Sequence, residues 1–349
     1  MRYGIKSLYD NKMNLQQVPS KNDDIRNMFV ADENSVLCNL DFSQQEMMAV
    51  SCLADDDKML EAFHLGRDIY SHVASIAFKV PYEDCLEFNA DGTTNKEGKI
   101  RRKKSKAICL GIVYGKGVPA IADDLHVDME TAQEIKDNIL KAFPKLSQYL
   151  QDVVKFGKKN GYVENFFGVK RRLPDLQLEK YEFIFNGDVP EETQRYYKSL
   201  YTGKLNKCRY KKEEEKIIDS ALKKGIYIKK NGGFIAQAER LAYNAPVQST
   251  AAILIKKAMN NIAYNKKLQE YGVEILLSIH DEVCLNVPIE HAYEAIQIAK
   301  KEFLSAGKDL KADLKCDVEI AKCWSGQSLV FDENHNLIPL EKGGWDYEI

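Results

Sequence analysis

A histidine and two adjacent acids, His280, Asp281 and Glu282, interrupt an otherwise apolar stretch of this sequence. The residues around them, 274–287, predict two strands that meet at a tight turn. Burying the two carboxylates costs several kcal/mol unless they are paired or bind a cation. An ordinary hairpin turn is the alternative, because aspartate is common in turns. Taken alone, the pattern supports both interpretations about equally.

A further acid, Asp41, follows the short apolar run 36–40. Ser43 and Glu46 have the spacing of a capping box, so we expect a helix directly after this strand. Aspartate also favours helix starts, which is the simpler explanation for Asp41. If the two acidic strand ends lie together, they could hold Mg²⁺, which binds carboxylate and phosphate oxygens. Two such ions about 4 Å apart stabilise the attacking and the leaving oxygen in phosphoryl transfer.

A third feature is a basic stripe with an aromatic end, formed by Arg102, Lys106, Leu110 and Tyr114. The spacing of four places these residues on one face of a helix. The two cations could hold a triphosphate, and the tyrosine could stack on a base. As a bare run of charges, the segment would more often be a solvated helix face.

The order of the predicted elements indicates an α+β domain, because strands come early and late with helices between them. Residues 176–236 lack a long apolar period and carry 13 Lys or Arg against 9 Asp or Glu, so we expect a surface insertion there. The other expected elements are helices at 69–78, 99–114, 130–143, 146–157, 238–260 and 289–305, a hairpin within 162–174, and a strand at 317–321.

Composition is that of a globular protein able to bury a core, with 349 residues, 44% hydrophobic residues and a net charge of −2. The eight cysteines form no Cys-x-x-Cys pair, which argues against a zinc site or a disulfide scaffold. We find no membrane span and no signal peptide, and therefore expect a cytoplasmic protein that does not bind membranes. The near-neutral charge does not exclude nucleic acid, since a groove needs only local charge.

Taken together and in this order, the three features resemble the motifs of DNA polymerase family A, the bacterial polymerase I class. Residues 41–46 (DFSQQE) resemble motif A, residues 102–115 (RKKSKAICLGIVYG) motif B, and residues 280–282 (HDE) motif C. The resemblance runs from about residue 5 to Trp324 and is interrupted by the insertion. Further segments in their usual places are NLQQVP (14–19), GRDIY (66–70), GYVENFFGVKRRLPD (161–175) and ERLAYNAPVQSTAA (239–252).

The resemblance implies a polymerase palm with an antiparallel sheet and mostly helical fingers. Residues 1–60 and 244–349 would form the palm, and residues 61–243 the fingers with their insertion. We expect an enzyme of viral or mobile-element type. No thumb and no exonuclease domain are expected in this sequence, so it would be a core that needs a separate polypeptide for those parts, or a truncated product of a longer gene. The implied function is template-directed extension of a primer 3′ end with dNTPs.

The family's catalytic residues carry over one by one. Asp41, Asp281 and the carbonyl of Phe42 would bind two Mg²⁺ ions, with Glu282 in a supporting role. Lys106 would hold the incoming triphosphate and is a candidate proton donor to the leaving pyrophosphate.

The resemblance also implies the nucleotide and primer–template contacts. Arg102 would bind the triphosphate, Tyr114 would stack at the insertion site, and Glu46 would occupy the place of a ribose 2′-hydroxyl. Tyr70 replaces a phosphate-contacting histidine and could still donate a hydrogen bond, whereas Leu110 replaces an aromatic residue that tunes sugar discrimination. The expected primer–template contacts are Asn14, Gln16, Arg240, Asn244, Gln248 and His280.

Two other functions remain open at this point. A single-subunit RNA polymerase shares the palm and the metal-binding aspartates, but Glu46 and the HDE sequence argue against it. A catalytically silent DNA-binding subunit of a replication complex is the alternative from another class. The joint presence of Asp41, Asp281 and Lys106 argues against that loss of activity.

Overall fold

The computed structural model describes residues 18 and 23–340, which divide into two compact units. Among the described residues, the first unit comprises those up to 150, residues 165–169 and those from 246 onward, and the second comprises residues 151–164 and 170–245. Among the described residues, no helix is both long enough and apolar enough to cross a membrane. All eight cysteines are free thiols.

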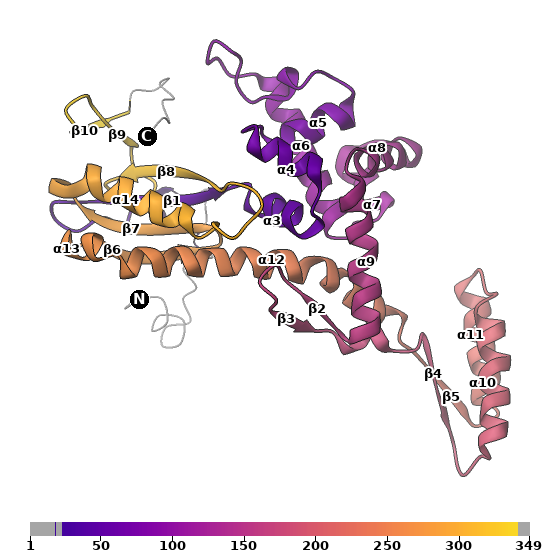
Figure 1. Cartoon of the computed structure of the whole chain (residues 1–349). Helices are drawn as coiled ribbons and strands as arrows, with labels where there is room; N and C mark the ends of the chain where they lie inside the picture. The colour runs from indigo at the N-terminus through magenta and orange to yellow at the C-terminus, as the bar shows by residue number, and fades with distance from the viewer. Residues whose placement is uncertain (1–17, 19–22, 341–349) are drawn as a thin grey trace. The chain divides into compact units, whose positions relative to one another are not determined.

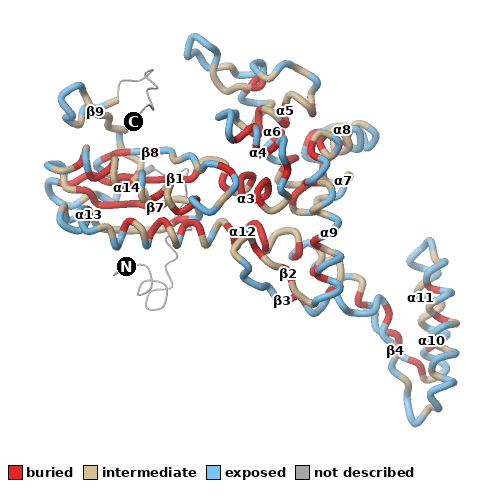
Figure 2. Tube along the Cα trace, in the orientation of Figure 1, coloured by how far each residue is buried: buried red, intermediate tan, exposed pale blue. Residues whose placement is uncertain are grey.

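A six-stranded antiparallel sheet in the order β10-β9-β8-β1-β7-β6 organises the first unit (Figure 1). Its central strand β1 is buried almost throughout (Figure 2), so both faces of the sheet are covered there. The predicted α+β architecture with an antiparallel sheet is therefore confirmed. The strands are β1 (Ser35–Ser43), β6 (Glu274–Ile279), β7 (Glu282–Pro288), β8 (Lys315–Ala321), β9 (Leu329–Phe331) and β10 (Leu337–Pro339).

Alternation along β1 sends its side chains to two different environments. Val36, Cys38, Leu40 and Phe42 join the main hydrophobic core. The ring of Phe42 stacks on that of Phe303 at 3.9 Å, which packs helix α14 (Ala292–Ser305) against the sheet. The alternate residues of β1 face the other side of the sheet. A smaller cluster is formed there by Leu37, Ile279, Cys284 and Trp324.

Four helices of the first unit confirm predicted positions, at 45–54, 69–78, 96–113 and 129–142. Four shorter helices, at 23–26, 57–64, 118–125 and 266–270, were not predicted. The capping box is wrong, because β1 continues through Ser43, whose hydroxyl donates to Asp317 at 2.7 Å. Gln44 is the residue before the helix, and its side chain makes no capping bond. The helices are α2 (Asp23–Arg26), α3 (Gln45–Ala54), α4 (Asp57–His64), α5 (Ile69–Phe78), α6 (Lys96–Val113), α7 (Val118–Leu125), α8 (Met129–Ala142) and α13 (Lys266–Glu270).

Two helices run across the boundary between the units, α9 (Pro144–Asn160) and α12 (Gly232–Tyr264). The expected irregularity at Pro246 lies inside α12, which continues through it. The expected helix 289–305 begins with a short 3-10 turn, and α14 itself starts at Ala292. The hairpin after Gly161 forms as β2 (Tyr162–Glu164) and β3 (Lys170–Arg172).

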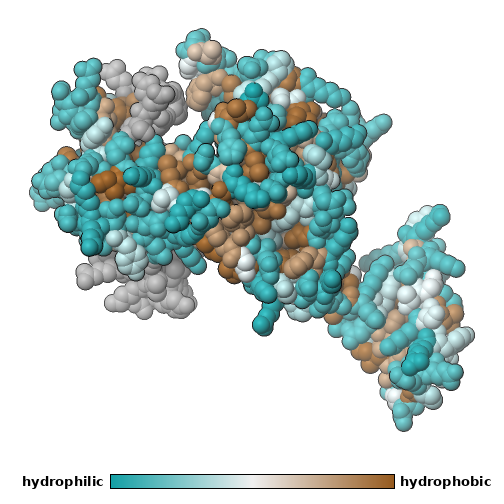
Figure 3. Space-filling model, viewed as in Figure 1, coloured by the Kyte–Doolittle hydropathy of each residue, from teal (hydrophilic) through white to brown (hydrophobic). Residues whose placement is uncertain are grey.

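The insertion is a folded module within the second unit. β4 (Tyr181–Phe185) and β5 (Ile226–Lys230) pair along their whole length and carry helices α10 (Glu191–Leu205) and α11 (Lys211–Leu222) between them. The visible face of these two helices is mainly hydrophilic (Figure 3). The inner side chains form a separate small core that includes Tyr181, Tyr201, Leu205, Ala221, Ile226 and Ile228.

Candidate active site

The register of the sheet collects acids from three strands on one face. Asp41 of β1 lies opposite Glu282 of β7 and opposite Asp317 of β8. Directly paired residues of neighbouring strands point to the same side of a sheet. Asn39 pairs in the same way with Glu319 of β8 in the next row. The acids therefore form a patch along the strands rather than a single row.

The turn between β6 and β7 adds a fifth acid, Asp281. His280 adopts a left-handed conformation with φ of 54°, which reverses the chain within two residues. The carbonyl oxygen of Asp281 then accepts a hydrogen bond from the amide of Phe42 at 3.3 Å. This bond fixes the turn against β1, so Asp41 and Asp281 are brought together as the sequence predicted.

The electrostatics of Asp41 are those of an acid held among other acids. The pKa of Asp41 is raised from 3.8 to about 7, first by burial and then by the charges of Asp281, Glu282 and Asp317. The charge of Lys106 on α6 lowers it, so this cation of the stripe lies within electrostatic reach of the patch. The pKa of Glu282 is also raised, first by burial and then by Glu319.

Two carboxylate oxygens in this patch are buried without a hydrogen-bond partner, Oδ1 of Asp41 and Oε1 of Glu282. Buried oxygens of this kind normally bind a donor or a cation. Across residues 18 and 23–340, no three or more His, Cys, Asp or Glu side chains form a cage that could hold a metal ion. The two unpartnered carboxylate oxygens fit Mg²⁺, which uses one or two carboxylates and takes its other ligands from water and substrate phosphates.

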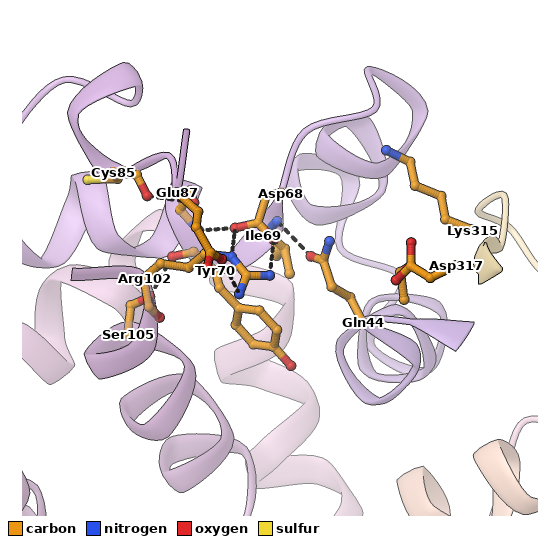
Figure 4. Close-up of polar contacts among 12 residues, drawn as sticks. Gln44, Asp68, Ile69, Tyr70, Cys85, Glu87, Arg102, Ser105, Lys315 and Asp317 are labelled. Atoms are coloured by element: carbon orange, nitrogen blue, oxygen red, sulfur yellow. Dashed lines mark hydrogen bonds and ion pairs between the residues drawn. The ribbon is translucent and has the colours of Figure 1, made fainter. Parts of the chain in front are cut away.

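Arg102 is held by an acid that the sequence analysis did not single out. Its Nε and Nη2 atoms donate to the carboxylate of Asp68 at 3.0 and 2.9 Å, and Glu87 lies 3.9 Å away (Figure 4). Asp68 also accepts from the amide of Ser71 at 2.7 Å and so caps α5. One carboxylate thus begins α5 and orients a cation of α6. The sequence signal that could have identified Asp68 is its position in GRDIY, directly before the predicted helix 69–78.

Tyr70 lies beneath the cations of α6. Only 2% of this residue is exposed, and its ring centroid lies 5.7 Å from the Arg102 guanidinium and 5.4 Å from Lys106 Nζ. Attraction between a cation and an aromatic face operates at such distances. Burial raises the pKa of Tyr70 well above its ordinary range, so the phenol stays neutral. The ring supports both cations, and its predicted phosphate contact stays a prediction.

The end of α6 meets the start of α3. The hydroxyl of Tyr114 donates to the carboxylate of Glu46, and burial together with this bond raises the pKa of Tyr114. Leu110, one turn earlier, is only partly exposed and packs against the main core. Gln44 links the same region to α5, because its side-chain oxygen accepts from the amide of Ile69 at 2.9 Å.

The predicted primer–template residues are distributed over both units. Arg240 and Asn244 belong to the second unit, whereas Gln248 and His280 belong to the first and are exposed. The side-chain oxygen of Asn244 is buried without a hydrogen bond. Asn14 and Gln16 lie outside the described residues.

The sequence profile of DNA polymerase family A matches residues 7–186 and 192–326. The thermostable DNA polymerase I of Thermus aquaticus is 29% identical over 314 residues, which are 89% of this chain and 30% of that protein. DNA polymerase I of Chloroflexus aurantiacus is 26% identical over 92% of this chain and 28% of its own length. These relatives are bacterial, so the comparisons give no support to the predicted viral or mobile-element source.

A similar solved structure is the POL domain of Pol1 from M. smegmatis, in complex with DNA primer-template and dNTP. It is 26% identical in sequence and has a TM-score of 0.64, and the match covers 89% of this chain and 44% of that one. The chain thus spans less than a third of the length of its curated relatives. With the profile matched along most of its length, the chain belongs to DNA polymerase family A.

Proposed function

We propose that this chain carries the polymerase active site of a template-directed DNA polymerase that extends a primer 3′ end with dNTPs. The observation that carries the proposal is the convergence of Asp41, Asp281 and Glu282 on one face of the sheet, with Lys106 within electrostatic reach. Family membership makes nucleotidyl transfer the chemistry that such a site would perform.

Asp41 and Asp281 would hold two Mg²⁺ ions, with the carbonyl of Phe42 as a further ligand. When bound, the ions supply positive charge to the attacking 3′ oxygen, to the transferred phosphate and to the leaving oxygen. Glu282, with its unpartnered oxygen on the same face, supports this charge from the neighbouring strand.

Lys106 and Arg102 would hold the triphosphate of the incoming nucleotide. Lys106 is exposed, so its ammonium can reach a phosphate and donate a proton to the leaving pyrophosphate. Asp68 fixes Arg102 through Nε and Nη2, and Nη1 lies 3.9 Å from Glu87, so the guanidinium is held in a defined orientation for a phosphate. Tyr70 keeps both cations in place from below.

Glu46 and Tyr114 would select the sugar. Their hydrogen bond places a carboxylate beside the aromatic ring on which the nascent base pair would stack. A ribose 2′-hydroxyl would compete for this space, so the pair favours deoxyribonucleotides. Within this scheme the palm comprises 1–60 and 244–349, and the fingers comprise 61–243.

The match covers only 30% of the Thermus aquaticus relative, and the further length of such relatives is expected to contribute to the grip on the duplex. We therefore propose that processive synthesis needs thumb and exonuclease domains, which either a longer form of this chain or a separate polypeptide supplies. Cytoplasmic location goes with this role in DNA synthesis.

Primer extension with Mg²⁺ tests the proposal most directly. Asp281→Ala should reduce extension at least about 100-fold, because it removes a group that stabilises charge in the transition state. Glu270→Ala, at an exposed carboxylate on α13, is the matched control and should extend primers like the wild type. Equal activity of wild type and Asp281→Ala would refute the assignment, and preferential use of rNTPs would favour an RNA polymerase instead.

A further inference from the structure

The insertion contains a pocket of about 470 Å³ between strand β4 and helix α10. Its floor includes Tyr181 and Phe183, which belong to or pack against the small core of this module. Its walls are polar, with Lys180 from the strand side and Lys198 from the helix side. The pocket therefore lies on a folded support rather than in an irregular loop.

Three uncharged polar residues follow one face of α10 into this pocket. Ser199, Thr202 and Asn206 are spaced by three and four residues, which places them on the same side of a helix. In the part of the chain that the structure describes, these three side chains and Lys198 make no hydrogen bond or ion pair. Four adjacent side chains thus retain donors for a ligand.

Carboxylates are scarce at this pocket. Some exposed lysines elsewhere on the insertion are paired with acids, as in Lys229–Glu182 at 3.1 Å and Lys211–Glu215 at 4.0 Å. At the pocket, the Lys180 ammonium lies 5.1 Å from the Tyr181 ring centroid. Glu179 is the single carboxylate among the residues that line the pocket.

We propose that this β4–α10 pocket binds the sugar–phosphate backbone of nucleic acid. Lysines combined with serine, threonine and asparagine donors are the side chains that proteins use for phosphate oxygens, and such contacts position the strand without reading its sequence. The net charge of +4 over residues 176–236 favours the same polyanion. This pocket proposal rests on the proposed function in one respect, the choice of DNA as the nucleic acid that binds.

The test measures DNA affinity of the whole chain by fluorescence anisotropy over a range of KCl concentrations. Single-stranded DNA and blunt duplex are used separately, which distinguishes the two sources of the backbone. The Lys180→Ala/Lys198→Ala double variant should bind the preferred form about tenfold more weakly at low salt. The slope of log K against log salt should fall by about 0.7 per lost contact for single strands and about 0.9 for duplex.

A matched control is Lys211→Ala/Lys229→Ala, which removes the same charge from the same module at lysines already paired with acids. Its affinity and slope should stay close to those of the wild type. Thr202→Val removes a donor without changing charge, so affinity should fall several-fold while the slope stays unchanged. Equal losses in both double variants, or none in the Lys180/Lys198 variant, would overturn the proposal.

Binding is read directly in this experiment and needs no catalysis. A chain that binds DNA through the pocket but fails to extend primers would contradict the proposed function alone. Conversely, if the chain is an active polymerase and its DNA affinity is unchanged in the Lys180→Ala/Lys198→Ala variant, the pocket proposal alone is contradicted. Thermal unfolding of each variant confirms that the module remains folded.

Discussion

Replacing Asp41 by asparagine should make the protein more stable in the absence of Mg²⁺. The pKa of this carboxyl is raised from 3.8 to about 7 by burial and by the neighbouring acids. Between these two values the folded state binds more protons than the unfolded state, so stability falls as pH rises from about 4 to about 7. Above pH 7 the full penalty is present, and Asp41→Asn removes it.

The size of the effect follows from the pKa. One pKa unit corresponds to about 1.4 kcal/mol, so a fully buried carboxylate with a pKa of about 7 would destabilise the fold by about 4 kcal/mol. Asp41 keeps part of its surface in solvent, and screening reduces our expectation to about 2 kcal/mol. For a protein of this size, that gain corresponds to a rise in Tm of about 3 °C.

Thermal unfolding in EDTA at pH 8 and at pH 5 measures this gain. The variant should exceed the wild type at pH 8, and the difference should shrink at pH 5. Mg²⁺ at ten times its Kd should then stabilise the wild type by about 1.4 kcal/mol and the variant by much less. Asp188→Asn, at an exposed carboxylate, serves as the control and should change stability by less than about 0.5 kcal/mol. An Asp41→Asn protein that is less stable than the wild type in EDTA at pH 8 would refute the reasoning.

Two further substitutions test the nucleotide site. Asp68→Asn keeps an acceptor for the cap of α5 but breaks the paired contact with Arg102. Steady-state kinetics should therefore show a KM for dNTP about tenfold higher, with little change in Tm. An unchanged or lower KM would show that Asp68 does not position the arginine. Glu46→Ala frees the Tyr114 hydroxyl and opens the space beside the sugar, and the ratio of kcat/KM for dNTP over rNTP should fall at least about tenfold. A constant ratio would remove Glu46 from sugar selection.

Sequence patterns predicted the elements around the acids well because burial and periodicity dominate there. The apolar run before Asp41 and the turn at His280 needed only local information. The capping box failed because Ser43 has a stronger partner in Asp317, which comes from a strand far along the chain. Such competition between a local motif and a neighbouring strand is decided by the sheet register.

Contacts between helices were beyond the reach of sequence patterns. Asp68 and Arg102 meet only because α5 and α6 pack side by side. The support of Tyr70 for two cations depends on the same packing. The family resemblance named Arg102 and Lys106 as phosphate ligands, whereas the groups that hold them in place required the fold.

The insertion was expected as a surface segment, but its strands were missed. Alternation at Tyr181, Phe183 and Phe185 and again at Ile226 and Ile228 is a strand pattern with one buried face. One acid and one lysine on the opposite face, Glu182 and Lys229, obscured this alternation in a reading by composition. Each half is also too short to be distinguished without knowledge of its partner.

The paired entry and exit of the insertion has a consequence for how it could be gained or exchanged. Tyr181 pairs with Lys230, and the amide of Asn231 donates to Lys180 at 3.0 Å, so the two ends are separated by one strand spacing of about 4.8 Å. A tight turn can bridge that gap, and closing so short a connection costs little conformational entropy. The paired strands β4 and β5 therefore make the insertion a module that recombination could add, remove or replace without changing the fold around it.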